Sequence, residues 1–546
     1  MPSNFMKTVY RAILFISFCL PFQSAIANSD SSSELRLLNE AFLANASATI
    51  AGTKLRNSKL VTTFYAENAY TPIWTTENKS SNKLQSLLRE IKASQSHGFH
   101  LSNYHFDVIS KQSESPSIVE ILATDAFISQ VKHRTLGVVS PQQIEPSWFL
   151  PAKEVDALAV LKKVIANDNI EKEMQSLWPL DSEYWLLIEK RASLVNQGDD
   201  EIVEIPSGKA LKKDTVSERV TKLKQRLKGP GNYSQEFDDE LEKLVKAFQL
   251  SNGLEPDGIV GTGTIQVLNA SNSVLIDRID ANLERWRWLP NKTPSDYIRV
   301  NIASFQLRLF KDDVQQLKMD VIVGKPYRKT PLFTESMKYM VVNPYWNVPF
   351  KIATQDKLLV LKSDPSKLDL LGFEAKAANS DVFEPVSNFN WANVSSRNFD
   401  YFLRQKPGPM NALGTIKFML PNPHSVYLHD TPDHSLFLKK ERSFSSGCIR
   451  LSEPSVLAEW ILNNDNQSNL VSDLNNALQG NQTQTLYLKK PLTVLIVYFT
   501  AFKDDKDQIV FRPDIYSRDE PIIVALENYR SQKISVENQI KIENKS

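Results

Sequence analysis

The sequence predicts an α+β protein of several domains, with a mainly helical N-terminal region, a small helical unit and a mostly β region. The 546 residues exceed the size of a single domain, which is roughly 150 residues. Apolar residues recur at helical spacing up to about residue 272, whereas short segments rich in valine, isoleucine and aromatic residues follow from residue 275. The charged fraction of 23% and the net charge of +1 are typical of a globular protein and do not indicate nucleic-acid binding.

The N-terminus has the pattern of a secretory signal peptide over residues 1–27. Lys7 and Arg11 precede an apolar run over residues 12–22, and small residues follow up to Ala27. We therefore expect cleavage after Ala27, export to the periplasm and no membrane span in the mature chain. An uncleaved anchor is the alternative, but the run is shorter than the roughly 20 residues that span a bilayer, and Pro21 interrupts it.

Cleavage would leave a single cysteine. It would remove Cys19 and lower the net charge from +1 to −1, so that Cys448 remains alone. One thiol cannot form an internal disulfide, and a free thiol in an oxidising compartment indicates chemistry. The alternative at this point is that Cys448 acts as a small buried hydrophobic residue.

Residues 28–210 are predicted to form a mainly helical scaffold domain. Amphipathic spacing predicts helices over Ser58–Tyr70, Asn82–Ser94 and Ile118–Leu136. His97 and His105 flank a loop, but a metal site there is disfavoured because no cysteine or acidic ligand lies nearby.

A small helical unit is predicted over residues 214–272. Its helices are expected over Val216–Leu227, Phe237–Leu250 and Thr262–Leu268, with a glycine-rich turn before the third helix. The stretch AFQLSNGLEPDGIVGTGTIQVLN resembles the three-helix peptidoglycan-binding domain of cell-wall hydrolases and transpeptidases. An ordinary helical spacer is the alternative.

Residues 275–530 are predicted to form a mostly β domain that opens with a helix over Leu275–Trp288. Residues 350–405 are polar and irregular, and an insertion of this size predicts a subdomain or a lid over a site. A polar tail is expected over residues 531–546. The predicted strands cover Tyr297–Ile302, Gln306–Phe310, Leu317–Val323, Tyr339–Val342, Ile416–Met419, Ser425–Leu428 and Leu492–Phe502.

The chemistry is predicted to centre on Cys448 and His429. His429 ends an apolar strand, and Cys448 follows 19 residues later. A free thiol, with a pKa of about 8.5, becomes a nucleophile when an imidazole takes its proton. Gly447 permits a tight turn and lets backbone N–H groups face a developing oxyanion. A helix predicted over Glu453–Leu462, together with Arg450, is expected to lower the thiol pKa.

The motif SSGCIR (Ser445–Arg450), preceded by His429, resembles the signature of the L,D-transpeptidase family. The match is closest to the large Gram-negative three-domain subfamily, with a YkuD-type catalytic domain and a peptidoglycan-binding domain. The same subfamily is indicated by VGKPYRKTP (Val323–Pro331), NPYWNVP (Asn343–Pro349), RQKPGPMNALGTIKF (Arg404–Phe418) and FRPDIYSRD (Phe511–Asp519).

This resemblance implies the L,D-transpeptidase fold for residues 275–530, with Cys448 as nucleophile and His429 as base. Backbone groups at Gly447 and Cys448 would form part of the oxyanion site. A backbone carbonyl would orient His429. Ser446 stands where the family often has histidine, so it cannot act as a second base. No metal or cofactor is required.

Four residues are candidates for substrate binding. Arg450 is expected either to bind a substrate carboxylate or to pair with Glu453. Tyr427 and Trp346 either line the donor site or belong to the core, and Asn411 is expected to shape a loop beside the site.

Two further arrangements around His429 are disfavoured. Asp430 as a third catalytic member would point away from its neighbour on a strand. A metal trio of His424, His429 and His434 has a spacing that does not place three side chains on one strand face.

The implied reaction is the formation of 3→3 diaminopimelate cross-links between peptidoglycan stem tetrapeptides, which serve as donor and acceptor. Such an enzyme acts in cell-wall biogenesis and cell shape, is acylated by carbapenems and has cell-wall synthases as possible partners. The alternatives are a hydrolase on the same fold, cleaving cross-links or wall anchors, and an inactive peptidoglycan-binding scaffold.

Overall fold

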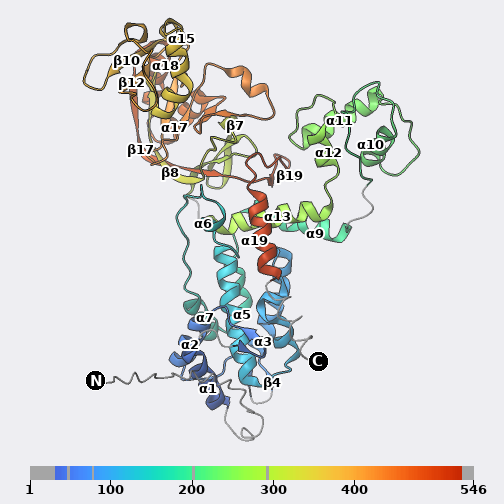
Figure 1. Cartoon of the computed structure of the whole chain (residues 1–546). Helices are drawn as coiled ribbons and strands as arrows, with labels where there is room; N and C mark the ends of the chain where they lie inside the picture. Colours follow the sequence, from blue (N-terminus) through green and yellow to red (C-terminus); the bar gives the residue numbers. More distant parts are fainter. Residues whose placement is uncertain (1–30, 46–48, 77–78, 199–202, 291–293, 532–546) are drawn as a thin grey trace, which may run out of the picture.

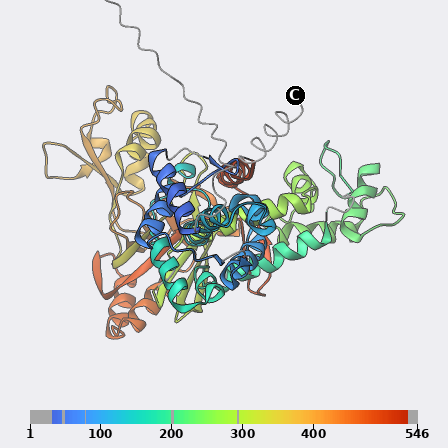
Figure 2. The same cartoon turned by 90° about the horizontal axis from the view of Figure 1, so that it is seen from below.

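The computed structural model describes residues 31–45, 49–76, 79–198, 203–290 and 294–531. A column of helices from the N-terminal region supports a β-rich domain, and a small helical unit projects to one side (Figures 1 and 2). The predicted signal peptide and residues 532–546 of the predicted tail lie outside the described residues. No described helix is both long and apolar enough to cross a membrane.

The N-terminal column is built around α5 (Pro116–Leu136), which is buried along most of its length. The predicted helices are confirmed, with α2 ending at Glu67 because Ala69 and Tyr70 have positive φ. The remaining elements are α1 (Ser31–Ala44), β1 (Thr49–Ile50), β2 (Thr53–Lys54), α2 (Ser58–Glu67), β3 (Thr75–Thr76), β4 (Lys79–Ser80), α3 (Asn82–Ala93), η1 (Ser94–His97), η2 (Leu101–Tyr104), α4 (Phe106–Lys111), α6 (Pro141–Ile144), α7 (Ala157–Asn167), α8 (Ile170–Gln175) and α9 (Ser182–Gln197).

The small helical unit contains the three predicted helices, α10 (Glu218–Lys228), α11 (Asp239–Ser251) and α12 (Thr262–Leu268). It has a hydrophobic core of its own, separate from the rest of the protein. An antiparallel bridge between Leu211 and Val260 closes the unit.

Helix α13 (Asn272–Trp288) connects the parts of the molecule. It packs along α9 and against α19 (Asp519–Ser531), the helix that descends from the β-rich domain onto the N-terminal column (Figure 1). One continuous hydrophobic core runs from the N-terminal column through α13 into the β-rich domain. These two parts are therefore packed as one body.

The β-rich domain contains a nine-stranded sheet in the order β15-β7-β16-β14-β13-β8-β17-β5-β6. An additional pairing between β6 and β7 closes the sheet on itself. The elements are β5 (Asp296–Asn301), β6 (Gln306–Lys311), β7 (Val314–Gly324), β8 (Phe333–Val342), β13 (Ile416–Met419), β14 (Leu428–His429), η5 (His434–Leu438), β15 (Ser443–Ser445), β16 (Ile449–Leu451), α17 (Pro454–Asn464), α18 (Asn469–Gln479), β17 (Gln484–Val497), β18 (Ala501–Lys503) and β19 (Ile509–Phe511).

Strands β7 and β8 begin earlier than predicted, at Val314 and Phe333, and two other predicted strands are shortened or interrupted. The strand predicted from Ser425 is shorter, because Ser425 has a φ of +55° and the Asn422 side chain bonds the backbone at Val426. The strand predicted over residues 492–502 is interrupted after Val497. There, the side chains of Asn301 and Asn282 accept hydrogen bonds from the backbone of residues 499 and 500.

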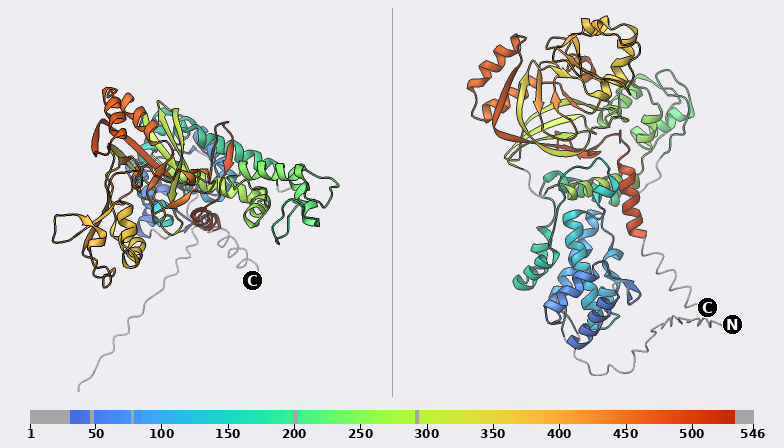
Figure 3. Two further views of the ribbon diagram at one scale, coloured as in Figure 1. Left: turned by 90° about the horizontal axis from the view of Figure 1, so that it is seen from above. Right: turned by 60° about the vertical axis from the view of Figure 1, so that its left-hand side comes forward.

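The predicted insertion folds as a lid subdomain, defined here as residues 346–413, with its own core (Figure 3, right). A four-stranded sheet in the order β11-β10-β12-β9 forms part of it. Its elements are β9 (Trp346–Asn347), α14 (Phe350–Ile352), the π-helix η3 (Ala353–Lys357), α15 (Leu358–Ser363), α16 (Ser366–Leu370), β10 (Phe373–Ala377), β11 (Glu384–Pro385), η4 (Val386–Asn388) and β12 (Tyr401–Gln405).

The N-terminal column also contributes backbone to the β-rich domain. Trp148 forms a parallel bridge with Leu332, just before β8. The Phe149 N–H donates to the Leu332 carbonyl at 2.8 Å, and the Leu332 N–H donates to the Ser147 carbonyl at 3.0 Å. Segment 147–149 therefore extends the edge of the domain that contains the candidate site.

Candidate active site

Strands β13, β14 and β16 place three basic side chains at neighbouring positions. Lys417 pairs with His429, and His429 pairs with Arg450. Because side chains alternate along a strand, Tyr427 and Cys448, each two residues earlier, are expected on the same face. The sheet register thus brings Cys448 and His429 to one surface.

Cys448 lies at the end of a tight turn. Ser445 Oγ donates to the Cys448 carbonyl at 2.5 Å and accepts the Gly447 N–H at 3.0 Å. Gly447 has a φ of +121°, which L side chains rarely adopt. The buried Thr330 hydroxyl donates to the Gly447 carbonyl at 2.9 Å. These bonds fix the turn and leave the Cys448 side chain half-buried.

The expected contribution of Gly447 to an oxyanion site is wrong for its N–H group, because Ser445 already accepts that hydrogen. The Cys448 N–H, by contrast, has no acceptor among the described residues. Within this turn, the N–H of Cys448 itself is the backbone donor available to a developing oxyanion.

A backbone carbonyl orients His429, as expected. Its Nδ1 lies 2.5 Å from the Asp430 carbonyl oxygen, so Nδ1 carries the proton and Nε2 is the basic atom. The Asp430 carboxylate turns away and accepts hydrogen bonds from the N–H and hydroxyl of Thr415 at 2.8 and 2.9 Å. Asp430 therefore acts on the imidazole through its main chain.

The expectation of a lowered thiol pKa is wrong for the structure. Burial raises the pKa of Cys448, although hydrogen bonds from Tyr427 and the charges of Lys417 and Arg450 act in the opposite direction. Burial also lowers the pKa of His429 to about 3. Among the described residues the thiol bonds to the Ser425 carbonyl, at 3.6 Å, and not to His429. A neutral thiol beside a neutral imidazole is therefore the resting state.

The expected effect of a helix dipole on Cys448 is not found in the structure. The predicted helix is confirmed as α17, but it begins at Pro454, after strand β16. Because a helix terminus acts mainly within its first turn, it contributes little at Cys448.

Tyr427 and Trp346 connect Cys448 to the lid subdomain. Trp346 lies in the core of the lid, and Tyr427 packs against that core. Burial raises the pKa of Tyr427, and its side chain interacts with Cys448 and with Trp346. The sequence left open whether these aromatic residues serve the core or the site. In the structure, Tyr427 and Trp346 link the core of the lid subdomain to the site at Cys448.

Lys417 is a site residue that the sequence analysis missed. Its Nζ lies 4.0 Å from the centre of the Tyr427 ring, and burial lowers its pKa while the charge of Cys448 raises it. No carboxylate pairs with it among the described residues. Only the pairing of β13 with β14, which the spacing of residues along the chain does not give, places Lys417 beside His429.

Arg450 has no ion pair with Glu453 or with any other carboxylate of the described chain. Its Nε is buried without a hydrogen-bond partner, and burial lowers its pKa, while the charges of Asp433 and Cys448 raise it. Of the two expected roles, the structure favours binding of an anionic substrate group.

Ser446 and Asn411 have structural partners. The exposed Ser446 accepts a hydrogen bond from Arg328 at 2.9 Å. Asn411 is buried, and its amide donates to the carbonyls of Pro344 and Lys406 at 3.0 and 2.8 Å. Its side-chain oxygen accepts the Leu413 N–H at 2.8 Å. Asn411 therefore shapes this loop, as expected, and these bonds engage the polar atoms of its side chain.

The histidines considered as metal ligands have other partners. His105 Nε2 lies 2.7 Å from a carboxylate oxygen of Asp125, and His424 stacks on Phe149 with ring centres 4.0 Å apart. Within the described ranges, no group of three or more histidine, cysteine or acidic residues is arranged to hold a metal ion.

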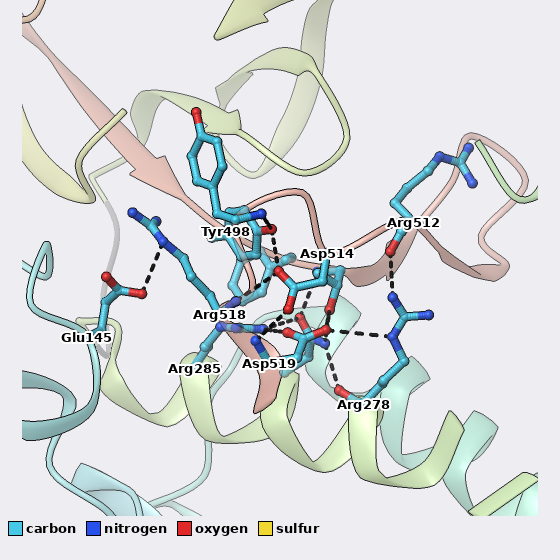
Figure 4. Close-up of polar contacts among 12 residues, drawn as sticks. Glu145, Arg278, Arg285, Tyr498, Arg512, Asp514, Arg518 and Asp519 are labelled. Atoms are coloured by element: carbon cyan, nitrogen blue, oxygen red, sulfur yellow. Dashed lines mark hydrogen bonds and ion pairs between the residues drawn. The ribbon is translucent and has the colours of Figure 1, made fainter. Parts of the chain in front are cut away.

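A polar network connects the turn that carries Cys448 to the N-terminal column. Arg518 contacts the Glu145 carboxylate at 3.1 Å (Figure 4), donates to Ser147 Oγ at 2.7 Å and reaches the Thr330 carbonyl at 3.4 Å. Thr330 in turn binds Gly447. The position of Cys448 thus depends on a contact between domains.

Comparison with known proteins identifies three family matches along the chain. Residues 59–190 match a scaffold domain, residues 216–268 match a family described as "Putative peptidoglycan binding domain", and residues 295–472 match the L,D-transpeptidase catalytic domain. A Haemophilus influenzae protein named "Putative L,D-transpeptidase" is 32% identical over 260 residues. The alignment covers 48% of this chain and 52% of that relative, so it spans about half of each protein.

Proposed function

Because this chain carries the catalytic domain of the L,D-transpeptidase family together with scaffold and peptidoglycan-binding domains, we propose that it cross-links peptidoglycan stem peptides through a thioester on Cys448. The observation that carries the proposal is the position of Cys448 directly before strand β16, which pairs with the strand of His429, together with a His429 Nε2 that is left basic.

In the first step, Cys448 Sγ attacks the carbonyl carbon that joins diaminopimelate to the terminal D-Ala of a tetrapeptide stem. His429 Nε2 takes the thiol proton as the carbon–sulfur bond forms. The carbon–nitrogen bond then breaks, the same proton passes to the leaving amine, and D-Ala departs. Because the resting imidazole is neutral, it is in the protonation state that this step requires.

In the second step, the side-chain amine of a second diaminopimelate attacks the thioester carbon. His429 accepts a proton from that amine and returns it to the departing sulfur, which restores the thiol. The product is a 3→3 cross-link. Water in place of the amine would give a tripeptide, which is the hydrolase alternative.

Charge that develops on the carbonyl oxygen requires donors in a dry site. The Cys448 N–H is unpaired in the described chain, and the Tyr427 hydroxyl interacts with the Cys448 sulfur. We assign these two groups to the oxyanion. Arg450 and Lys417, which lack carboxylate partners among the described residues, bind the carboxylates of the donor stem.

The proposal also places the protein outside the cytoplasm. A peptidoglycan-binding domain and a signal-like N-terminus support export to the periplasm, where the donor and acceptor stems lie. Cell-wall synthases that supply new stems are the expected partners.

Incubation with disaccharide-tetrapeptide tests this function. The wild type should form cross-linked dimers, and Cys448→Ala and His429→Gln should form none. His434→Gln is the matched control, because His434 is an exposed histidine on the following segment. Tripeptide without dimers would indicate hydrolysis, and unchanged substrate with the wild type would indicate a binding scaffold.

A further inference from the structure

A groove of about 1020 Å³ lies between the peptidoglycan-binding domain and the catalytic domain. Residues 250–255 of the former line one side, and segments 303–306, 318–320 and 437–444 of the latter line the other. Its volume is at the upper end of the range for ligand sites, which is about 300–1,000 Å³.

Two contacts hold the sides of the groove in place. The Lys440 N–H donates to the Glu255 carboxylate at 3.2 Å, and the Arg512 guanidinium donates to the Ser251 carbonyl at 2.8 Å. Gly253 has a φ of +70°, which disfavours other residues, and a Cβ there would lie 2.1 Å from Arg512 Cδ and displace this side chain. The groove is therefore a built interface.

Some charged side chains that line the groove have side-chain partners, and others have none. Asp320 pairs with Arg442 at 2.7 Å, Lys318 pairs with Asp505, and Glu441 accepts the Ser443 hydroxyl. In the described part of the chain, the groove side chains Lys439, Lys440 and Glu453 have no side-chain partner, and Glu255 is bonded only by the backbone N–H of Lys440.

The groove also adjoins the nucleophile segment. Phe444 lines it four residues before Cys448, and Ser452 lines it four residues after. A polymer lying in the groove would contact the chain on both sides of the turn that carries the thiol, at β15 and just after β16.

We infer that this groove binds a peptidoglycan strand, with Lys439 and Lys440 receiving carboxylates of its stem peptides and Glu453 facing an amino group. The inference rests on the proposed function for its choice of polymer, and it extends substrate binding from the centre at Cys448 to an interface between two domains. Two adjacent ammonium groups complement an anionic peptide, whereas the glycan alone offers no such charge.

Binding of the full chain to purified peptidoglycan sacculi tests the inference. The double variant Lys439→Gln/Lys440→Gln should bind roughly tenfold more weakly, since each exposed ion pair contributes up to about a factor of five. Lys92→Gln/Lys111→Gln is the matched control, with the same loss of charge on exposed positions of α3 and α4. Equal binding by the groove variant and the wild type would overturn the inference, and so would an equal loss in the control.

A second variant tests the effect of charge in the groove, and a second probe tests the role of the stem peptides. Leu438 is 82% exposed beside the groove, so Leu438→Glu adds a repelling charge without disturbing the core. It should weaken binding to intact sacculi. Sacculi stripped of stem peptides by an amidase should bind the wild type and both groove variants equally weakly. Retained tight binding to stripped glycan would contradict a role for stem carboxylates.

Binding to sacculi and acylation of Cys448 can be measured independently. Acylation of Cys448 by a carbapenem, read by intact-protein mass spectrometry, should be unchanged in the groove variants, because that small molecule does not reach the groove. A wild type that binds sacculi but is never acylated would refute the proposed function without affecting the inference that the groove binds peptidoglycan. Acylation of the wild type, together with groove variants that bind sacculi as tightly as the wild type, would refute only the inference about the groove.

Discussion

Arg328 binds Asp356 through two hydrogen bonds, of 2.6 and 2.8 Å, in the bidentate arrangement of a guanidinium and a carboxylate. The same Arg328 donates to Ser446, two residues before the nucleophile, at 2.9 Å. Asp356 lies in the π-helix of the lid subdomain, where Gln355 also accepts a bond from Arg328, at 3.1 Å. A single side chain therefore ties the lid to the nucleophile turn.

Asp356→Asn should loosen the lid without unfolding the protein. The carboxylate is partly exposed, and exposed pairs contribute only about 0.2–1 kcal/mol to the free energy of unfolding. Amide hydrogen exchange over residues 353–370 should accelerate, while the melting temperature stays nearly constant. Asp364→Asn, whose partners Lys367 and Ser366 lie on the same short segment, should leave this exchange unchanged. Unaltered exchange in Asp356→Asn would rule out a tie between the lid and the turn.

Lys417 should control the ionisation of Cys448. Because burial raises the pKa of Cys448 and Lys417 lowers it, Lys417→Met should raise that pKa further. Alkylation by iodoacetamide should then be severalfold slower at pH 7.5, and its rise with pH should shift to more alkaline values. Lys417→Arg, which keeps the charge, should remain close to the wild type.

Lys338→Met serves as the control for this effect, because Lys338 is exposed on the neighbouring strand β8. Its alkylation profile should match the wild type. A profile of Lys417→Met that coincides with the wild type would show that the ammonium group does not act on the sulfur.

Thr330 should determine the geometry of the nucleophile turn. Thr330→Val keeps the shape but removes the hydroxyl that donates to Gly447 and accepts from the Gly324 N–H at 3.0 Å. Leaving these buried groups unpaired costs about 1–3 kcal/mol, so both stability and the rate of carbapenem acylation should fall. Thr330→Ser restores the hydroxyl and should recover both. Full acylation by Thr330→Val would refute the assigned role.

Buried histidines should make the protein less stable in mild acid. Burial lowers the pKa of His133 to about 3 and of His97 to about 2, so both are neutral in the folded chain. The unfolded chain binds these protons below its histidine pKa of about 6.5, and stability is therefore lost as the pH falls from that value towards 3. At pH 5 each contributes a loss of about 2 kcal/mol.

Urea unfolding at pH 7.5 and pH 5.0 measures this effect. His133→Gln should be less stable at pH 7.5, because it loses the contact of His133 with Tyr104, but its loss between the two pH values should be smaller by about 2 kcal/mol. His100→Gln, at an exposed position, should keep the wild-type pH dependence. An identical pH dependence in His133→Gln would contradict a neutral, buried His133 in the folded chain.

Local patterns predicted most elements of this fold. Helix α12 and strand β13 have the predicted bounds, because apolar spacing and flanking turns define them. The break after Val497 was not predictable, since it depends on Asn282 and Asn301, about 200 residues away.

Some residues of the candidate site can likewise be predicted from the sequence, and others cannot. Cys448 and His429 follow from a motif, and the carbonyl that orients His429 follows from the resemblance to a family. Lys417 and Arg328 required strand register and a long-range contact. The sequence predicts a lowered thiol pKa, whereas burial raises it. Burial is the largest cause of the shift, and it cannot be read from neighbouring residues along the chain.

Intact-protein mass spectrometry tests the central proposal most directly. After incubation with disaccharide-tetrapeptide, the wild type should carry one acyl group equal in mass to the substrate minus D-Ala, and Cys448→Ala should carry none. Treatment with a second tetrapeptide should remove the adduct and yield a dimer. An adduct of the same mass on Cys448→Ala, or cross-linked dimers made by that variant, would contradict a thioester on Cys448.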